Sequence, residues 1–178
     1  MYPLVLKFWF AEIEPRQWWE KDREFDQRIA TRFGLLHAQA TQCELYNWRT
    51  TALGRLAEVI VLDQFSRNMY RGRAGAFAHD ALALALAQEA VAIGADLELE
   101  PMQRAFLYMP YMHSESAAIH RVAEPLFRER TTAESHAFEL RHKAIIDRFG
   151  RYPHRNTILG RRSTDEERTF LQQPDSSF

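Results

Sequence analysis

Residues 53–72 read LGRLAEVIVLDQFSRNMYRG, and this stretch decides the fold class. Its first half carries apolar residues at the three- and four-residue steps of one helix face, namely Leu53, Leu56, Ala57 and Ile60. The run then leads straight into a more polar segment at residues 62–65. The spacing predicts a helix, and no alternating strand pattern or hairpin turn competes with it.

The same helical periodicity continues along the rest of the chain. An earlier segment carries its apolar stripe at Phe25, Ile29, Phe33 and Leu36. A third helix is predicted over the alanine-rich residues 76–93, with Gly94 in the position that commonly ends a helix. These segments predict an all-α protein, an antiparallel helix stack in which residues 1–178 form a single helical domain.

Start signals predict further helices in the second half of the chain. Glu100 and Pro101 can open one helix, since proline is tolerated in the first turn. Pro110 should then kink or restart that helix, because proline lacks a backbone donor. The sequences TTAE at residues 131–134 and STDE at residues 163–166 predict capping boxes that begin two later helices.

Composition and charge limit the classes of function. The chain has 178 residues, 46% hydrophobic and 26% charged, as in an ordinary globular protein, and its formal charge of −1 argues against nucleic acid or an anionic membrane as partner. Residues 1–10 are apolar but run into Glu12 and Glu14 without a cleavage site, so they do not predict a signal peptide. Cys43 is the only cysteine, which favours the cytoplasm and a small buried side chain.

The first polar cluster lies at the end of the opening stretch. Asp63, Arg67 and Arg71 are four residues apart, so on a helix they share one face, with Asn68 beside them. Asp63 can hold the guanidinium of Arg67 rigid, while Arg71 stays free to bind an anion. The alternative is an ordinary ion pair on a helix surface, worth roughly a few tenths of a kcal/mol.

The second polar cluster lies just after Pro110. His113 can act as a general acid or base near neutral pH, with Glu115 orienting it or acting itself and Ser114 positioning a ligand. Residues two apart do not face each other on a helix, so direct contact between His113 and Glu115 requires a local break. A histidine hydrogen-bonded within the core is the alternative interpretation.

The third cluster is basic. Residues 141–162 hold seven lysines and arginines against one acidic residue, a local charge of +6 in a nearly neutral chain. Arginines and a histidine ahead of a helix start are typical of a phosphate or carboxylate site. The candidates are Arg151, His154, Arg155, Asn156 and Arg161. A solvated basic loop is the alternative, and one loop is a small footprint for nucleic acid.

Other classes of site are not favoured. The seven histidines form no metal-ligand spacing, so we predict no metal and no cofactor, and no nucleophile motif is present. The tryptophans are expected to pack the helix stack, with an aromatic-lined groove as the alternative. They are Trp9, Trp18, Trp19 and Trp48.

The motifs that carry these clusters resemble the bacterial family of domain of unknown function 924. They lie in order at residues 61–72, 106–115 and 148–156, and the similarity continues at residues 159–161, 163–167 and 174–178. It spans the chain from Val5 onward. The resemblance implies an all-helical fold, a tetratricopeptide-like superhelix, and no particular activity, substrate or cofactor.

The chain departs from the family pattern at three positions. Ser66 stands where a proline is usual, and Tyr152 stands where phenylalanine is usual. Ser116 follows Glu115 where an acidic residue is common, which weakens any mechanism that uses paired carboxylates there.

The three clusters together predict one pocket for a small anionic ligand that bears a phosphate or carboxylate. The anion would be bound by Arg67, Arg71, Arg151, Arg155 and Arg161, with the polar side chains of Asp63, Asn68, Ser114 and Asn156 around it. Acid–base chemistry would fall to His113, Glu115 and His154. The alternative is a non-enzymatic, tetratricopeptide-like module that binds a peptide or protein. A third interpretation is a buried polar network that locks the helices together, and a homodimer is compatible with each.

Overall fold

The computed structural model of the protein describes residues 1–174 and 176, and in that part of the chain every regular element is helical. The predicted all-α class is confirmed. The α-helices are α1 (Tyr2–Lys7), α2 (Arg23–Thr41), α3 (Ala52–Ile60), α4 (Ser66–Met69), α5 (Asp80–Ala92), α6 (Pro101–Met112), α7 (Ala117–Arg130), α8 (Ala133–Phe149) and α9 (Asp165–Phe170). Most of the motif at residues 174–178 lies outside the described residues.

Short turns of other helical types connect these helices. Two π-helical turns cover Phe8–Glu12 and Val61–Phe65. The 3₁₀ turns are Pro15–Trp18, Tyr46–Thr50, Ala74–Phe77, Ala95–Glu98 and Pro153–Arg155.

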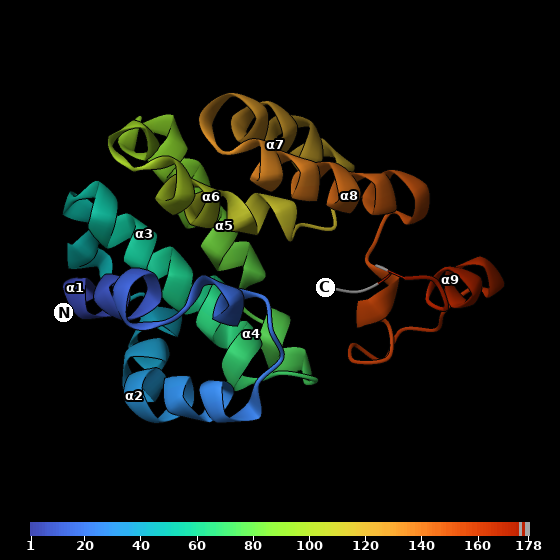
Figure 1. The fold of residues 1–178 in the computed structure, drawn as a ribbon, viewed down its shortest axis with the longest axis horizontal. Coiled ribbons are helices and arrows are strands. Elements are labelled where there is room, and N and C mark those ends of the chain that lie inside the picture. The colour runs from blue at the N-terminus through green and yellow to red at the C-terminus, as the bar shows by residue number, and fades with distance from the viewer. Residues whose placement is uncertain (175, 177–178) are drawn as a thin grey trace.

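The helices pack in a stack in which neighbours along the chain are often neighbours in space (Figure 1). α6 packs on α7 and α7 on α8, while α3 contacts α1, α5 and α6. Only Thr131 and Thr132 separate α7 from α8, so these two helices run antiparallel. Figure 1 shows α9 set apart from α1–α4 at the other end of the molecule. The tetratricopeptide-like superhelix is a finer description and stays a prediction.

The aromatic opening of the chain packs the core. Trp9 is 1% exposed, and Trp18 and Trp48 pack partly buried against the same core. Trp19 differs, since it is 57% exposed and stacks against the ring of Phe106 at a centroid distance of 6.0 Å. Three of the four tryptophans therefore contribute to the helix stack in the way the sequence predicts.

A π-helical turn places the first polar cluster inside the molecule. The backbone of α3 stays helical at Val61 and continues through the π turn into α4. A π turn inserts an extra residue into a helix and changes which side chains face inward. Asp63 lies in this turn and is fully buried.

The predicted restart of the helix at Pro110 does not occur. α6 continues through Pro110 and ends at Met112, and His113 is its C-terminal capping residue. Buried packing on neighbouring helices holds this turn together although proline removes one donor. The chain leaves the helix only after His113, and residues 114–116 form the connection to α7.

Three predicted boundaries shift along the chain. The alanine-rich helix begins at Asp80 rather than near residue 76. Thr132, not Thr131, caps α8, because its hydroxyl accepts the backbone N–H of Ser135. At α9 the capping box lies one residue later than predicted.

The capping box of α9 uses Thr164 and Glu167 instead of Ser163 and Glu166. The Thr164 hydroxyl accepts the N–H of Glu167 at 3.2 Å, and the Glu167 carboxylate accepts the N–H of Thr164 at 2.7 Å. The shift turns Glu167 inward, where it is 2% exposed.

The buried position predicted for Cys43 is also wrong. Its side chain is exposed, in the turn between α2 and Tyr46–Thr50. Its backbone has a φ of 59°, a left-handed conformation that few residues other than glycine adopt.

Candidate functional site

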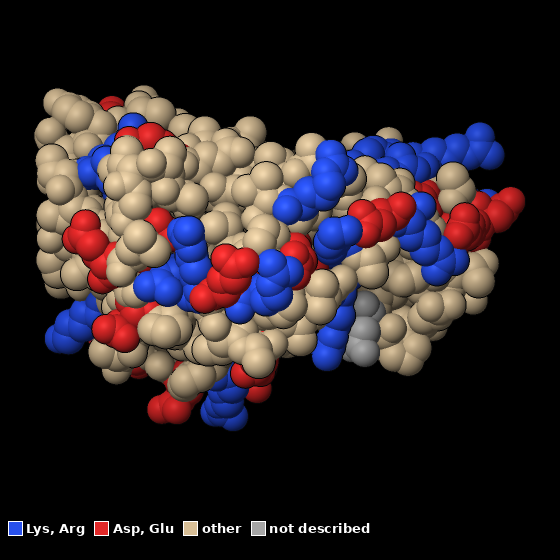
Figure 2. All heavy atoms as spheres, turned by 90° about the horizontal axis from the view of Figure 1, so that it is seen from above, with Lys and Arg blue, Asp and Glu red and all other residues tan. Residues whose placement is uncertain are grey.

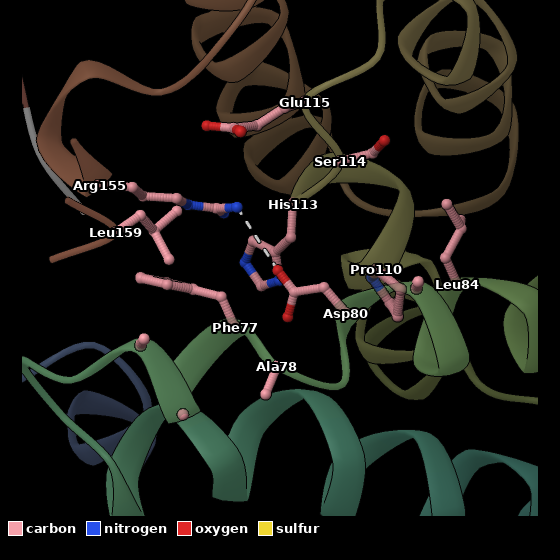
Figure 3. Close-up of a pocket in the computed structure, with 13 residues that line it drawn as sticks. Phe77, Ala78, Asp80, Leu84, Pro110, His113, Ser114, Glu115, Arg155 and Leu159 are labelled. Atoms are coloured by element: carbon pink, nitrogen blue, oxygen red, sulfur yellow. Dashed lines mark hydrogen bonds and ion pairs between the residues drawn. The ribbon is translucent and has the colours of Figure 1, made fainter. Parts of the chain in front are cut away.

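A pocket of about 650 Å³ lies where α5, the end of α6 and the segment after α8 meet (Figure 3). Its polar lining comes from Asp80 at the start of α5, from His113, Ser114 and Glu115 after α6, and from Arg155. Its apolar lining includes Phe77, Leu84, Pro110 and Leu159. Four predicted residues from two separate clusters therefore line one pocket.

His113 is held by a hydrogen bond to a buried carboxylate. Its Nδ1 lies 2.8 Å from Oδ1 of Asp63, whose other oxygen accepts a hydrogen bond from Gln64 at 2.7 Å. Burial disfavours the charge of Asp63, but Arg67 and His113 hold its pKa below the usual range. An ionised carboxylate only accepts hydrogen bonds, so the proton between the two residues is on Nδ1 of His113.

The second nitrogen of His113 is available to a ligand. Burial, followed by the charge of Arg67, lowers the pKa of His113, so its imidazole is neutral near pH 7. No hydrogen bond to Nε2 is present within the described part of the chain. A neutral imidazole with a free Nε2 lone pair has the form of a general base.

Arg67 links the His113–Asp63 pair to Asp80 of the pocket. Its Nη1 lies 3.1 Å from the carboxylate of Asp63, so the predicted ion pair is confirmed. The guanidinium also donates to both oxygens of Asp80, at 2.9 and 3.0 Å. Burial disfavours the charge of Arg67, but the two carboxylates raise its pKa. Arg67 does not line the pocket. It fixes Asp80, which does, and Asp63, which holds His113.

Arg155 is a buried cation with weak compensation. The residue is 6% exposed. Its guanidinium carbon lies 4.5 Å from the ring centre of Phe77 and 4.6 Å from that of Tyr152. Among the described residues, the closest carboxylate oxygen belongs to Asp80, 3.4 Å from Nη1. Nε is buried and has no hydrogen-bond partner among residues 1–174 and 176.

The electrostatics of Arg155 differ from those of the other arginines. Burial, followed by the charge of Arg67, lowers the pKa of Arg155. In contrast, the hydrogen bonds that Arg71 donates to Asp26, and those that Arg151 donates to Glu167, raise the pKa of these two arginines. Arg155 is thus stabilised chiefly by two aromatic rings and retains donors that an anion can fill.

Glu115 lines the pocket as an ionised, already bonded carboxylate. Arg161 binds it through two parallel hydrogen bonds of 2.6 and 2.9 Å, and the backbone N–H of Tyr152 donates to it at 2.7 Å. Burial opposes the charge, but these donors lower the pKa of Glu115. His113 and Glu115 make no direct hydrogen bond in the described structure. Both reach the pocket because the chain has left α6 between them.

No residue of the first cluster lines the pocket: Asp63 and Arg67 contact residues that do, whereas Asn68 and Arg71 bind a carboxylate on α2. Arg71 binds both oxygens of Asp26 on α2, at 2.6 and 2.8 Å, and Asn68 donates to the same carboxylate at 2.8 Å. These contacts join α2 to the end of α4. Arg71 therefore has a carboxylate partner where the sequence predicted a free cation.

Three residues of the basic segment also lie elsewhere. Arg151 binds Glu167 through hydrogen bonds of 2.7 and 2.9 Å, and the buried Asn156 donates to the same carboxylate at 3.3 Å. His154 does not line the pocket, and burial followed by the charge of Arg155 lowers its pKa to about 4. Arg151 and Asn156 thus fasten α9 to the segment after α8.

The local charge of +6 is offset in space. Arg148 pairs with Glu166 and Arg161 with Glu115, in addition to the Arg151–Glu167 and Arg155–Asp80 contacts, and all four carboxylates lie outside residues 141–162. Figure 2 shows acidic residues lying among the basic ones along the face that it displays. The basic segment is therefore largely a set of ion pairs, because carboxylates from other segments lie beside it.

Sequence reasoning did not identify Asp80 or Phe77, which complete the pocket. Asp80 begins α5 and lies directly ahead of an alanine-rich helix, and an acidic residue at a helix start is common in any protein. Phe77 reads as one more apolar residue. Neither carries a local signal of a binding site.

The described residues show neither a metal-site geometry nor a membrane-spanning helix. No group of three or more histidine, cysteine, aspartate or glutamate side chains with the geometry of a metal site is found among them. Nor does any helix in residues 1–174 have the length and apolarity that a membrane crossing needs.

The fold and the site define an all-helical protein with a buried Asp–His–Arg network behind a small pocket. The profile of the family described as bacterial protein of unknown function (DUF924) matches residues 5–175, and the chain belongs to this family. Its fold is similar to that of the protein of unknown function ATU0120 from Agrobacterium tumefaciens, with a TM-score of 0.91, 36% sequence identity and 96% of each chain covered. No curated protein matches the chain. The predicted family is confirmed.

Proposed function

We propose that the pocket binds a small ligand through a phosphate or carboxylate group on Arg155, with His113 as its acid–base group. The observation that carries the proposal is the state of Arg155, a residue 6% exposed whose closest carboxylate contact among the described residues is 3.4 Å long. A buried donor without a partner costs about 1–3 kcal/mol, more when it is charged. An anionic group would supply the missing acceptors.

His113 is suited to move a proton to or from such a ligand. The ionised Asp63 holds Nδ1–H and would stabilise the imidazolium that forms when Nε2 accepts a proton. Arg67 and Asp63 act through His113 and are positioning residues. Glu115 and Ser114 line the same pocket and would orient the ligand.

The alternative is a non-enzymatic, tetratricopeptide-like module that captures the C-terminal carboxylate of a peptide on Arg155. Such a module needs the cation but has no use for a desolvated imidazole oriented by a buried carboxylate. The His113–Asp63 pair therefore favours a small ligand on which acid–base chemistry occurs.

Thermal shift measurements with a panel of phosphates and carboxylates would test the proposal. The panel would be applied to the wild type, to Arg155→Met and to Arg162→Met, a control at an exposed arginine of the same segment outside the pocket. At about 100 times its Kd, a ligand should stabilise the folded protein by about 2.7 kcal/mol. We expect this shift for the wild type and the control but not for Arg155→Met.

Arg155→Lys would separate binding from folding, since it keeps the charge but loses the planar donors. An unchanged circular dichroism spectrum with weakened binding is the expected result for this variant. A ligand that stabilises Arg155→Met as much as the wild type would overturn the proposed site. A response to peptides alone would favour the module.

A further inference from the structure

The charges that face the pocket are of both signs. Among the described residues that line it, Arg155 contributes one positive charge, whereas Asp80 and Glu115 contribute two negative charges. His113 is neutral, as argued above. The arginines that neutralise the two carboxylates, Arg67 and Arg161, are not part of the lining. A purely anionic ligand bound to Arg155 would therefore lie beside the two carboxylates of Asp80 and Glu115.

Both carboxylates retain acceptor capacity. Oε2 of Glu115 accepts one hydrogen bond, from Arg161 at 2.6 Å, and Oδ1 of Asp80 accepts one, from Arg67 at 2.9 Å, within the described structure. A carboxylate oxygen has two lone pairs, so each of these atoms can accept one more donor. Their side chains are 24% and 20% exposed, which leaves them accessible from the pocket.

The remaining walls of the pocket are apolar. Figure 3 shows Leu84 and Pro110 on one side, with Arg155 and Glu115 on the other and Asp80 between them. Three small residues, Ala74, Ala78 and Ala81, also contribute to the lining. The pocket thus offers one cation, two anions and an apolar wall within a single space.

We infer that the ligand carries an ammonium group as well as a carboxylate, and that it is an α-amino acid with an apolar side chain of about the size of leucine. This inference rests on the proposed function, in which Arg155 binds the carboxylate. The ammonium donates to Glu115 and Asp80, and the side chain lies against Leu84 and Pro110. The zwitterionic ligand adds no net charge to a site whose own charges are balanced: Arg67, Arg155 and Arg161 face Asp63, Asp80 and Glu115.

Isothermal titration calorimetry with three matched probes would test the inference on the wild-type chain. The probes are L-leucine, 4-methylpentanoate, which lacks the ammonium, and 3-methylbutylamine, which lacks the carboxylate. One charge-assisted hydrogen bond is worth about tenfold or more in affinity. L-Leucine should therefore bind at least about tenfold more tightly than either of the other probes.

Two variants assign the ammonium contact. Glu115→Gln should weaken the binding of L-leucine by about tenfold and leave the affinity for 4-methylpentanoate unchanged, because only L-leucine carries the ammonium donor. Glu166→Gln, at an exposed glutamate that pairs with Arg148, is the matched control and should change neither.

The outcomes distinguish this inference from the proposed function. If 4-methylpentanoate binds the wild type as well as or better than L-leucine, and Arg155→Met abolishes both, the ammonium site is refuted while the anion site stands. If neither probe binds but a phosphate raises the Tm of the wild type and not that of Arg155→Met, the amino-acid ligand is refuted while the anion site stands. If no anion binds at Arg155, both proposals fail.

Discussion

Replacing Arg67 by methionine should destabilise the protein far more than the same substitution at Arg71. The two arginines lie one helical turn apart and each binds a carboxylate of another helix. The Arg67 side chain is 19% exposed and contacts Asp63 and Asp80, which are 1% and 20% exposed. The Arg71 side chain is 36% exposed and faces Asp26, at 14%. The substitutions are matched in length and charge, so burial is the main difference.

Burial determines the expected size of each effect. Removing one partner of a buried ion pair costs about 3–5 kcal/mol, because it leaves an uncompensated charge, whereas an exposed pair contributes about 0–1 kcal/mol. A domain of this size changes its Tm by about 2–4 °C per kcal/mol. Arg67→Met should therefore lower the Tm by about 6–20 °C, and Arg71→Met by at most about 4 °C.

Urea unfolding followed by circular dichroism at pH 7 would measure the two free energies of unfolding. The comparison is valid if the m-values agree, since m reports the surface exposed on unfolding. A double-mutant cycle with Asp80→Asn adds the coupling between Arg67 and Asp80, expected to be about 1 kcal/mol or more. Losses for Arg67→Met and Arg71→Met that agree within about 0.5 kcal/mol would refute the buried network.

Three further predictions concern pH and helix capping. Hydrogen bonds from Arg151 lower the pKa of Glu167 to about 2 from 4.5. The ionised carboxylate therefore contributes its full stabilisation above about pH 5, and this contribution is lost as the pH falls toward 2. Glu167→Gln should flatten that part of a profile of Tm against pH, and an unchanged slope would contradict the assignment. Burial lowers the pKa of His142 to about 3 from 6.5, so stability should fall as the pH drops below about 6.5, and His142→Gln should make the fall between pH 6.5 and 4.5 shallower than in wild type. Thr132→Ala removes the cap of α8 and should cost about 1 kcal/mol in urea unfolding, whereas no measurable loss would argue for a different cap.

Helix positions were predictable because their signals are local. The stripe at Phe25, Ile29 and Phe33 is buried in the structure, and Gly94 and Gly150 end their helices in the left-handed conformation. Helix starts were predicted less accurately. At residues 131–134 and 163–166, two adjacent hydroxyl residues can each cap the helix, and packing decides between them.

The pocket was predicted in part. His113, Ser114, Glu115 and Arg155 line it, because titratable residues around a proline and ahead of a helix start are a recognisable pattern. The partner of His113 is Asp63, 50 residues earlier in the chain. No spacing rule predicts a contact over that distance, since it depends on how α3, α4 and α6 pack.

The all-α class, the main helices and the polar side chains that gather near the site follow from the amino-acid sequence, because helical periodicity and residue chemistry are properties of short segments. Which charges are neutralised depends on how the helices pack. Arg71 and Arg151 have their carboxylates on other segments, at Asp26 and Glu167, while Arg155 lies between two aromatic rings with weak compensation. The physical reason is that an ion pair depends on the distance between atoms across packed helices, and that distance is fixed by burying the apolar core.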